Sequence, residues 1–242
     1  MLNYKKRIVI TGGTGRFGQV FKNKSSYFNF DFLFPSKNDL NILDIKSINK
    51  YLSRKKPKYL IHLAGLSRPM NLHDKSINES IDKNIIGTAN ITKGCSKLKI
   101  KLIYVSTCYV YPGKKGNYSE LDPLLPINNY AWSKLGGESA VQMYKNSLIL
   151  RASITEKPFV HKSAFTDFKT NFIFHEDLIE KILKIIDEKG VVNVGGKSQS
   201  VYNFAKKYNR KIKKISAKKL LGKKTPTNIT MNINKFIKLI ND

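Results

Sequence analysis

The sequence contains few cysteines and no long apolar run. Its only cysteines, Cys95 and Cys108, form no CxxC pair, and its 4 histidines are not clustered. Neither a disulfide framework nor a metal site is therefore predicted. Near the N-terminus, the basic residues Lys5–Arg7 precede only Ile8–Ile10, which is too short for the hydrophobic part of a signal peptide. No segment approaches the ~18 apolar residues of a membrane span. We therefore predict a cytoplasmic chain with no membrane partner.

Acidic residues are also scarce: 17 of them stand against 44 basic residues, which gives a formal net charge of +27. A surplus of this size attracts polyanions without specifying one. The segment Lys206–Lys224 is especially basic and contains no acidic residue. Because the chain has no basic motif interleaved with aromatic residues, we predict no specific nucleic-acid partner. Most lysines are interpreted as solvated surface, with attraction of a negatively charged nucleotide-sugar as the alternative, and a partner for the basic tail stays open.

The length of 242 residues and the 41% of hydrophobic residues are typical of one globular domain with room for a small lobe. Short β-branched runs alternate with helical patterns over residues 1–150, which predicts an α/β fold with a Rossmann-type, doubly wound parallel sheet. Residues 151–242 are predicted to form a small C-terminal lobe that is not sharply separated from it.

The pattern also predicts the individual elements. The expected strands are Arg7–Thr11, Asp31–Phe34, Tyr59–Leu63, Lys101–Val105, Ser147–Leu150, Phe172–Phe174 and Val191–Val194. The expected helices lie near Gly15–Asn23, Ile45–Arg54, Ser76–Lys97, Tyr130–Lys145, Glu176–Asp187 and Asn234–Ile240.

A glycine-rich turn joins the first predicted strand to the first predicted helix. Glycines at this spacing permit a tight turn, a close approach of the backbone to a pyrophosphate and close packing of helix on strand, while the helix N-terminus supplies N–H donors. Because a strand precedes the turn and a helix follows it, we predict a dinucleotide site, with a purely structural turn as the alternative. The predicted contacts are Gly12, Gly15, Arg16, Phe17 and Gly18.

The end of the second predicted strand decides between the two nicotinamide cofactors. An acidic residue there binds the ribose hydroxyls of NAD, whereas basic groups bind the 2′-phosphate of NADP. Ser36 and Lys37 occupy this region and, helped by Arg16, favour NADP. NAD stays possible, because Asp39 takes the acidic position if the strand ends later. Residues 1–150 are accordingly interpreted as an NAD(P)-binding domain.

Tyr130 and Lys134 form a YxxxK pair in a predicted helix, so their side chains lie on one face. A free tyrosine has a pKa of about 10, too high for acid–base work at neutral pH, and a nearby cation lowers that pKa by favouring the phenolate. We therefore predict that Tyr130 donates or accepts a proton. At the end of the fourth predicted strand, the hydroxyl of Thr107 is a candidate to hydrogen-bond the reacting carbonyl, with Ser106 as the alternative.

Taken together, these motifs resemble the extended short-chain dehydrogenase/reductase family. The nearest branch is similar to dTDP-4-dehydrorhamnose reductases, because Lys37–Asp44 and Ser106–Tyr111 echo two segments of that branch. The resemblance covers residues 7–151 well and the remainder loosely. The segments that carry it are Thr11–Gly18, His62–Gly65, Asn84–Thr88, Ser106–Tyr111, Tyr130–Glu138 and Asn193–Gly196.

The resemblance implies an enzyme that uses NAD(P) to act on nucleotide-sugars. It implies catalytic roles for Thr107, Tyr130 and Lys134, and it also assigns Lys134 to the nicotinamide ribose. For Asn84, a structural role and a functional role are both left open. The further cofactor contacts implied are Asp44 and Ile45 at the adenine, and Leu63, Ala64 and Gly65 along the cofactor.

Two departures from the family narrow this prediction. Cys108 stands where nucleotide-sugar dehydratases have a carboxylic acid, so the chain lacks the group that protonates a leaving hydroxyl. The stretch after Arg151 is short where relatives insert a longer segment, so the C-terminal lobe is predicted to be a reduced substrate-binding lobe. Arg151, Phe165 and Asp167 are its candidates for substrate contact.

We therefore predict a reductase that transfers hydride from NAD(P)H to a keto-carbon of a nucleotide-sugar, with Tyr130 as proton donor, in polysaccharide biosynthesis. The alternatives are an epimerase that uses the same residues and a catalytically silent, dinucleotide-binding regulatory protein. The resemblance also implies a possible homodimer through the helices predicted at Ser76–Lys97 and Tyr130–Lys145.

Overall fold

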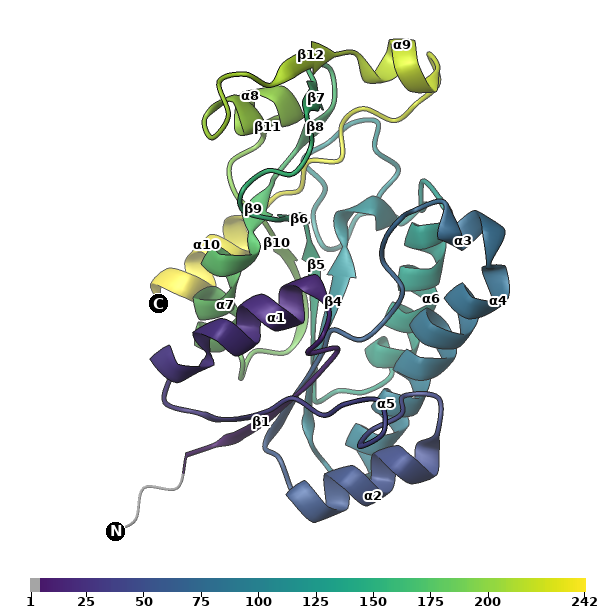
Figure 1. Cartoon of the computed structure of the whole chain (residues 1–242), viewed down its shortest axis with the longest axis vertical. Helices are drawn as coiled ribbons and strands as arrows, with labels where there is room; N and C mark the ends of the chain where they lie inside the picture. Colours follow the sequence, from purple (N-terminus) through teal and green to yellow (C-terminus); the bar gives the residue numbers. More distant parts are fainter. Residues whose placement is uncertain (1–4) are drawn as a thin grey trace. The chain divides into compact units, whose positions relative to one another are not determined.

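The computed structural model describes residues 5–242, which form two compact units that alternate along the chain (Figure 1). The first unit contains the chain up to Ser106 together with Trp132–Ile149 and Ile186–Gly190. The second unit contains Thr107–Ala131, Leu150–Ile185 and Val191–Asp242. Within residues 5–242, none of the helices is long and apolar enough to cross a membrane.

A six-stranded sheet with the order β10-β5-β4-β3-β1-β2 is the main element of the fold. The pairs β1 with β2, β1 with β3, and β3 with β4 are parallel, so the predicted doubly wound α/β fold is confirmed. Its strands are β1 (Arg7–Thr11), β2 (Asp31–Leu33), β3 (Tyr59–His62), β4 (Lys101–Thr107), β5 (Ser147–Ala152) and β10 (Gly190–Val194).

The strand sequences explain why this sheet is internal. Ile8, Val9 and Ile10 of β1 are completely buried, and every residue of β3 is buried. Continuous apolar strands of this kind are typical of parallel sheets that are covered by helices on both faces. Figure 1 shows α1 on one face of β1 and β3, and α2 and α5 on the other. The helices of the first unit include α1 (Arg16–Lys24), α2 (Ile45–Lys55), α5 (Gly87–Lys97) and most of α6 (Asn129–Gln142).

Helix α2 illustrates how the sequence sets helix ends. The Asp44 side chain caps its start by accepting the backbone N–H of Lys46 at 2.8 Å. Ile48 and Leu52 are fully buried on its inner face. The helix ends where Lys56 adopts a left-handed conformation with φ of 46°.

The helix predicted at Ser76–Lys97 is present as three consecutive helical segments, α4 (Ile77–Ser80), a π-helical turn η2 (Ile81–Ile86) and α5. A separate short helix that was not predicted, α3 (Leu72–Lys75), precedes them. Ser76 separates α3 from α4 because its backbone, with φ of −129° and ψ of 64°, is not helical. The π-helical turn contains Asn84, whose side chain bonds to the loop after β3. π-helical turns of this kind occur frequently at functional sites.

The second unit consists of short elements. Its three small sheets pair β6 with β9, β7 with β12, and β8 with β11. This unit also contains an aromatic cluster, which extends from its interior to the exposed Tyr208. We define the cluster as Phe159, Phe172, Phe174, Phe204 and Tyr208. The remaining elements are η3 (Cys108–Val110), β6 (Ile154–Thr155), β7 (Ser163–Phe165), β8 (Lys169–Thr170), β9 (Ile173–Phe174), α7 (His175–Lys184), β11 (Gln199–Ser200), α8 (Val201–Lys206), β12 (Lys213–Ile215), α9 (Ala217–Leu221) and α10 (Asn234–Asn241), with η1 (Ser25–Tyr27) in the first unit.

Candidate functional site

The glycine turn between β1 and α1 has space only for glycine at two positions. Gly12 has φ of 74°, and a Cβ atom there would lie 2.6 Å from the backbone nitrogen of Ala64. A Cβ atom on Gly18 would lie 2.2 Å from the carbonyl oxygen of Gly12. The N-cap Gly15 offers no side-chain acceptor to the first N–H groups of α1. This helix start is therefore able to donate its N–H groups to an anion such as a phosphate.

Ser36 and Lys37 are exposed and follow β2, which ends at Leu33 and not at Phe34 as predicted. The carboxylate of Asp39 accepts hydrogen bonds from the hydroxyl of Ser36 at 2.7 Å and from its backbone N–H at 3.0 Å. These hydrogen bonds lower the pKa of Asp39. Asp39, the acidic residue that favoured NAD, is thus hydrogen-bonded to Ser36, whereas Lys37 is an exposed cation.

Asp44 and Ile45 lie at the start of α2, where Asp44 caps the helix. The sequence analysis did not identify this capping role, although an aspartate directly before a helical pattern is a standard signal for it. The role of both residues at an adenine stays a prediction.

A buried hydrogen-bond network fixes the end of β3 in the first unit. His62 contacts the hydroxyl of Thr11 at 2.7 Å through Nδ1 and that of Thr88 at 3.1 Å through Nε2. The Thr11 hydroxyl also accepts the N–H of Ala64 at 3.3 Å. Burial, with a smaller contribution from the positive charge of Lys134, lowers the pKa of His62 to about 3. The imidazole is therefore neutral and bonds Thr11 next to the glycine turn.

Asn84 connects three segments of the first unit. Its Oδ1 atom accepts the N–H of Leu66 at 2.7 Å, and its Nδ2 atom donates to the carbonyl of Leu66 at 2.9 Å and to the hydroxyl of Ser133 in α6 at 2.8 Å. Gly65 has to be glycine here, because a Cβ atom on it would lie 2.7 Å from Asn84 Oδ1. The arrangement gives Asn84 a structural role, in that it holds Leu63–Leu66 against α6.

Lys134 is positioned by Tyr104 of β4. The Tyr104 hydroxyl donates to the carbonyl of Lys134 at 3.0 Å, and the Lys134 Nζ atom lies 4.1 Å from the centre of the Tyr104 ring. The His62 ring stacks on the same tyrosine at 5.9 Å. Removal of water from the Lys134 ammonium group lowers its pKa to about 7, although the nearby Glu138 carboxylate acts in the opposite direction. Lys134 therefore changes its charge near neutral pH.

Ser106 and Thr107 have different hydrogen-bond partners. The Ser106 hydroxyl donates to the carboxylate of the buried Glu138 at 2.6 Å. The Thr107 oxygen accepts the backbone N–H of Tyr109 at 3.3 Å, and its side chain contacts the neighbouring Cys108 but, among residues 5–242, no carboxylate. Thr107 therefore fits the predicted role better than Ser106. The sequence analysis missed Tyr104 and Glu138 as partners, although Glu138 stands four residues after Lys134 on one helix face.

Tyr130 lies in the first turn of α6, four residues before Lys134, and is half-buried. Within the second unit, its ring lies 6.4 Å from the ring of Tyr109 with an interplanar angle of 75°. Cys108, next to Thr107, is buried, and burial raises the pKa of its thiol to about 11. A thiol that stays protonated at neutral pH is a packed residue and not a nucleophile.

The three candidates for substrate contact, Arg151, Phe165 and Asp167, each contact other residues of the second unit. The buried Arg151 donates from Nη1 to the hydroxyl of Tyr111 at 2.8 Å and to the carbonyl of Glu120 at 3.0 Å. Asp167 accepts hydrogen bonds at the start of α9, and the Phe165 ring contacts Phe168 at 6.2 Å. None of these contacts was predicted, and those of Arg151 and Asp167 join segments that are distant in the sequence.

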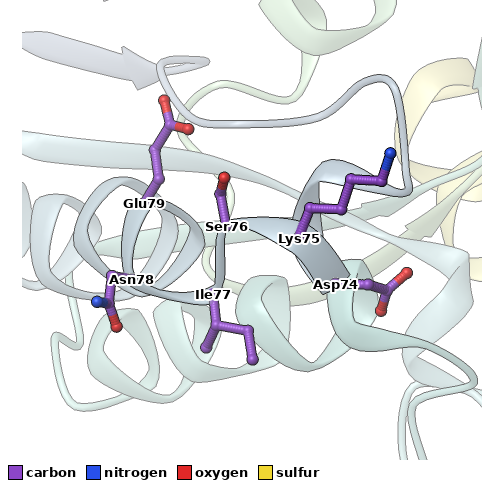
Figure 2. Close-up of a pocket in the computed structure, with 6 residues that line it drawn as sticks. All are labelled: Asp74, Lys75, Ser76, Ile77, Asn78 and Glu79. Carbon is purple, nitrogen blue, oxygen red and sulfur yellow. The ribbon is translucent and has the colours of Figure 1, made fainter.

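A surface hollow of the first unit lies away from these residues. It is lined by six consecutive residues around the break between α3 and α4, and Figure 2 shows Ser76 and Glu79 extending on one side and Ile77 on the other. None of the predicted site residues lines it. Within residues 5–242, no group of three or more His, Cys, Asp or Glu side chains is placed to hold a metal ion.

Comparison with known proteins gives both a family and a fold. The family model described as RmlD substrate binding domain matches residues 6–170. Methionine adenosyltransferase 2 subunit beta of Rattus norvegicus is 28% identical over 143 residues, which cover 56% of this chain and 42% of that protein. The dTDP-4-dehydrorhamnose reductase of Mycolicibacterium smegmatis is 27% identical over 138 residues, which cover 56% of this chain and 41% of that protein. These matches span less than half the length of either relative.

Among solved structures, the dTDP-4-dehydrorhamnose reductase of Bacillus anthracis in complex with NADP has a TM-score of 0.86 to this chain. The two chains are 23% identical, and the alignment covers 98% of this chain and 93% of that one. At this identity the likeness establishes a common fold.

Proposed function

The chain belongs to the family described as RmlD substrate binding domain, and on this premise we propose that it is an NAD(P)H-dependent reductase of a nucleotide-linked keto-sugar. Membership of this family agrees with the resemblance carried by the sequence motifs. The observation that carries the proposal is helix α6, on which Tyr130 and Lys134 are one turn apart. Lys134 is held there by the ring and hydroxyl of Tyr104.

The first unit fits a nicotinamide dinucleotide at its glycine turn. Gly12 and Gly18 leave no space for a side chain, and the uncapped start of α1 has N–H groups to donate to a pyrophosphate. Leu63, Ala64 and Gly65 extend along the cofactor in the proposal, with Asp44 and Ile45 at the adenine. We propose NADP as the preferred cofactor because Arg16 and Lys37 are exposed cations, while Asp39 is bonded to Ser36. The reduced cofactor supplies a hydride.

Tyr130 is the proton donor in this proposal. When the carbonyl carbon receives the hydride, its oxygen gains negative charge, and the Tyr130 hydroxyl transfers its proton to that oxygen. The positive charge of Lys134 favours the phenolate that remains. The Thr107 hydroxyl donates a hydrogen bond to the same oxygen, because the Ser106 hydroxyl is already bonded to Glu138.

A second candidate function is a dinucleotide-binding subunit without turnover of its own. The observation that favours it is the likeness to methionine adenosyltransferase 2 subunit beta, which is named as a subunit of an enzyme of another class. An epimerase is a variant of the first proposal, since it uses the same residues but returns the hydride to the substrate and consumes no net NADPH.

The assembly and the setting of the reaction are parts of the same proposal. The first unit exposes Ile77, Ile81, Ile86 and Trp132, with exposed fractions of 55%, 39%, 45% and 51%. Apolar side chains exposed from α4, η2 and α6 support a homodimer through these helices. We place the reaction in the cytoplasm and in polysaccharide biosynthesis.

The test compares the wild type with Tyr130→Phe. Both proteins should bind NADPH with similar affinity, and only the wild type should consume it with keto-sugar nucleotides. We expect Tyr130→Phe to lower turnover by about 10³-fold. Binding without consumption in both proteins would favour the subunit, and product formation without net NADPH loss would favour the epimerase.

A further inference from the structure

One end of the second unit carries exposed leucines between exposed lysines. We call residues 216–224 the basic tip; it contains α9 and the loop that follows. Leu220 is 67% exposed and Leu221 is 58% exposed, although leucine is normally a core residue. Two lysines precede this pair, and two more follow it after Gly222. All four are exposed: Lys218, Lys219, Lys223 and Lys224.

The basic tip is held in a defined conformation by Asp167. The Asp167 carboxylate accepts hydrogen bonds from the hydroxyl of Ser216 and the N–H of Ala217, both at 2.6 Å, and from the N–H of Lys218 at 3.2 Å. Although burial alone would raise it, these hydrogen bonds lower the pKa of Asp167 to about 2. The carboxylate therefore stays charged and keeps its bonds to the start of α9 at any physiological pH.

Neither the charges nor the apolar side chains of the basic tip are covered by the described chain. Within residues 5–242, no ion pair involves any of its four lysines. Gly222, directly after the leucine pair, has φ of 98°, and a Cβ atom added to it would meet no atom within 4 Å. Figure 1 shows α9 as an outlying helix beyond β12 in the second unit. The basic tip is thus a projecting surface and not a groove.

The chemistry of this surface distinguishes between two kinds of polyanion. Single-stranded nucleic acid is bound by cations together with exposed aromatic rings on which bases stack. The basic tip has no aromatic residue. Nearby, the Tyr202 ring is covered by the ammonium groups of Lys206 and Lys214 at 5.9 and 5.3 Å, and Tyr208 packs on Phe174 at 4.8 Å. Contact with phosphates does not stabilise an exposed leucine side chain, whereas its transfer from water into lipid lowers the free energy.

We propose that the basic tip docks on the surface of a bilayer rich in anionic phospholipid. Leu220 and Leu221 enter the boundary between headgroups and acyl chains, and the four lysines contact the phosphates around them. Apolar insertion combined with basic residues is the general mode of peripheral membrane binding. The sequence-based prediction of no membrane partner rested on the lack of a spanning segment, which a peripheral contact does not need. The proposal is independent of the reaction at Tyr130.

The test is flotation of the full chain with vesicles of two compositions. One is phosphatidylcholine alone, and the other is an equal mixture of phosphatidylcholine and phosphatidylglycerol. We expect the wild type to float only with the anionic vesicles. The double variant Leu220→Ser/Leu221→Ser should bind them about tenfold more weakly. Replacement of the four tip lysines by glutamine should weaken binding by at least ~100-fold.

Matched controls separate the basic tip from general charge and general apolarity. Leu121→Ser changes a leucine that is 96% exposed elsewhere in the second unit, and it should bind like the wild type. A second control replaces four exposed helix lysines of the first unit by glutamine and so removes the same charge. It should weaken vesicle binding by less than a tenth as much as the change at the four tip lysines. These control residues are Lys22, Lys50, Lys93 and Lys97. An equal loss in this control would overturn the proposal.

RNA and a direct probe of insertion complete the test. Binding to polyuridylate should be unchanged by the leucine variant. If that variant instead binds anionic vesicles like the wild type, the surface acts by charge alone and the proposal is wrong. In a Trp132→Phe background, which removes the only tryptophan, Leu221→Trp should show a blue-shifted fluorescence with anionic vesicles. An unshifted spectrum with bound vesicles would also contradict insertion.

Discussion

The first unit fixes its loops with side chains that bond to the backbone, whereas much of the interior of the second unit is filled with aromatic rings. Thr11 and Asn84 bond to backbone groups after β3, and Gly12 allows the backbone of Ala64 to come close. In the second unit, Phe174 and Phe204 contact other rings at 5–6 Å. Backbone bonding demands particular residue types at particular positions, while a packed interior accepts many apolar residues. The first unit is therefore the more recognisable part of the sequence.

The largest expected effect is at the ammonium group of the first unit. Lys134→Met should reduce keto-sugar reduction by about 10³-fold, since the cation that assists Tyr130 is lost. Lys145→Met, an exposed lysine after the same helix, is the control and should keep full activity. NADPH consumption in steady state measures both.

The pH profile of kcat/KM tests the same group in the wild type. Because the pKa of Lys134 is lowered to about 7, its positive charge is present below that pH and is lost above it. The rate should therefore fall as the pH rises through about 7. A rate that stays constant between pH 6 and 9 would mean that Lys134 keeps its charge, and so contradict this cause.

The aromatic cluster is the corresponding test of the second unit. Phe204→Ala removes a ring that contacts four others of the cluster and should reduce the free energy of unfolding by about 3 kcal/mol. Tyr27→Ala, at a tyrosine that is 80% exposed, should change it by less than about 0.5 kcal/mol. Urea titrations give both values, and a loss below about 1 kcal/mol at Phe204 would remove the contrast between the units.

Substitutions at the adjacent residues Ser106 and Thr107 should have opposite effects on stability and on turnover. Ser106→Ala removes one hydrogen-bond donor from the buried Glu138 carboxylate and should cost about 2 kcal/mol of stability with little loss of turnover. Thr107→Val should instead reduce turnover and cost less stability. Thermal unfolding and NADPH consumption separate the two effects, and the reverse pattern would give the catalytic hydroxyl to Ser106.

The smallest expected effect concerns the choice of cofactor. Lys37→Glu should weaken NADPH binding by about tenfold, which corresponds to about 1.4 kcal/mol, and leave NADH binding nearly unchanged. Fluorescence titration with both cofactors measures it, and Lys56→Glu serves as the control at a lysine outside the predicted site. Equal weakening for both cofactors would show that Lys37 does not distinguish them.

The sequence predicted the parts of the molecule in which the residue type is itself the constraint. Strands β1 and β3 were identified from continuous apolar runs, and the glycine turn from positions that exclude a side chain. The π-helical turn inside the predicted helix Ser76–Lys97 was missed because six residues are too few for their apolar spacing to distinguish it from an α-helix. Of the three small sheets only β9 was predicted, as the strand Phe172–Phe174, because strands of two or three residues have no period to detect.

The site was predictable in the same uneven way. The YxxxK spacing identified Tyr130 and Lys134, but the contacts of Lys134 with Tyr104 and of Ser106 with Glu138 join segments that are 30 and 32 residues apart. Such pairs depend on how β4 and α6 pack together in the fold and not on any local sequence pattern. Asp39 was taken as an argument for NAD because of its charge alone. Its hydrogen bond with Ser36 is seen only in the structure of the loop.

The bonds of Asn84 to both backbone groups of Leu66 have a consequence for the cost of binding. Fixing the backbone of a flexible residue costs roughly 1–2 kcal/mol of conformational entropy, which a ligand supplies if it orders the loop itself. Here the loop is ordered before any ligand arrives, so the whole interaction energy remains available for affinity. The amide hydrogen of Leu66 should accordingly exchange slowly with solvent even in the free protein.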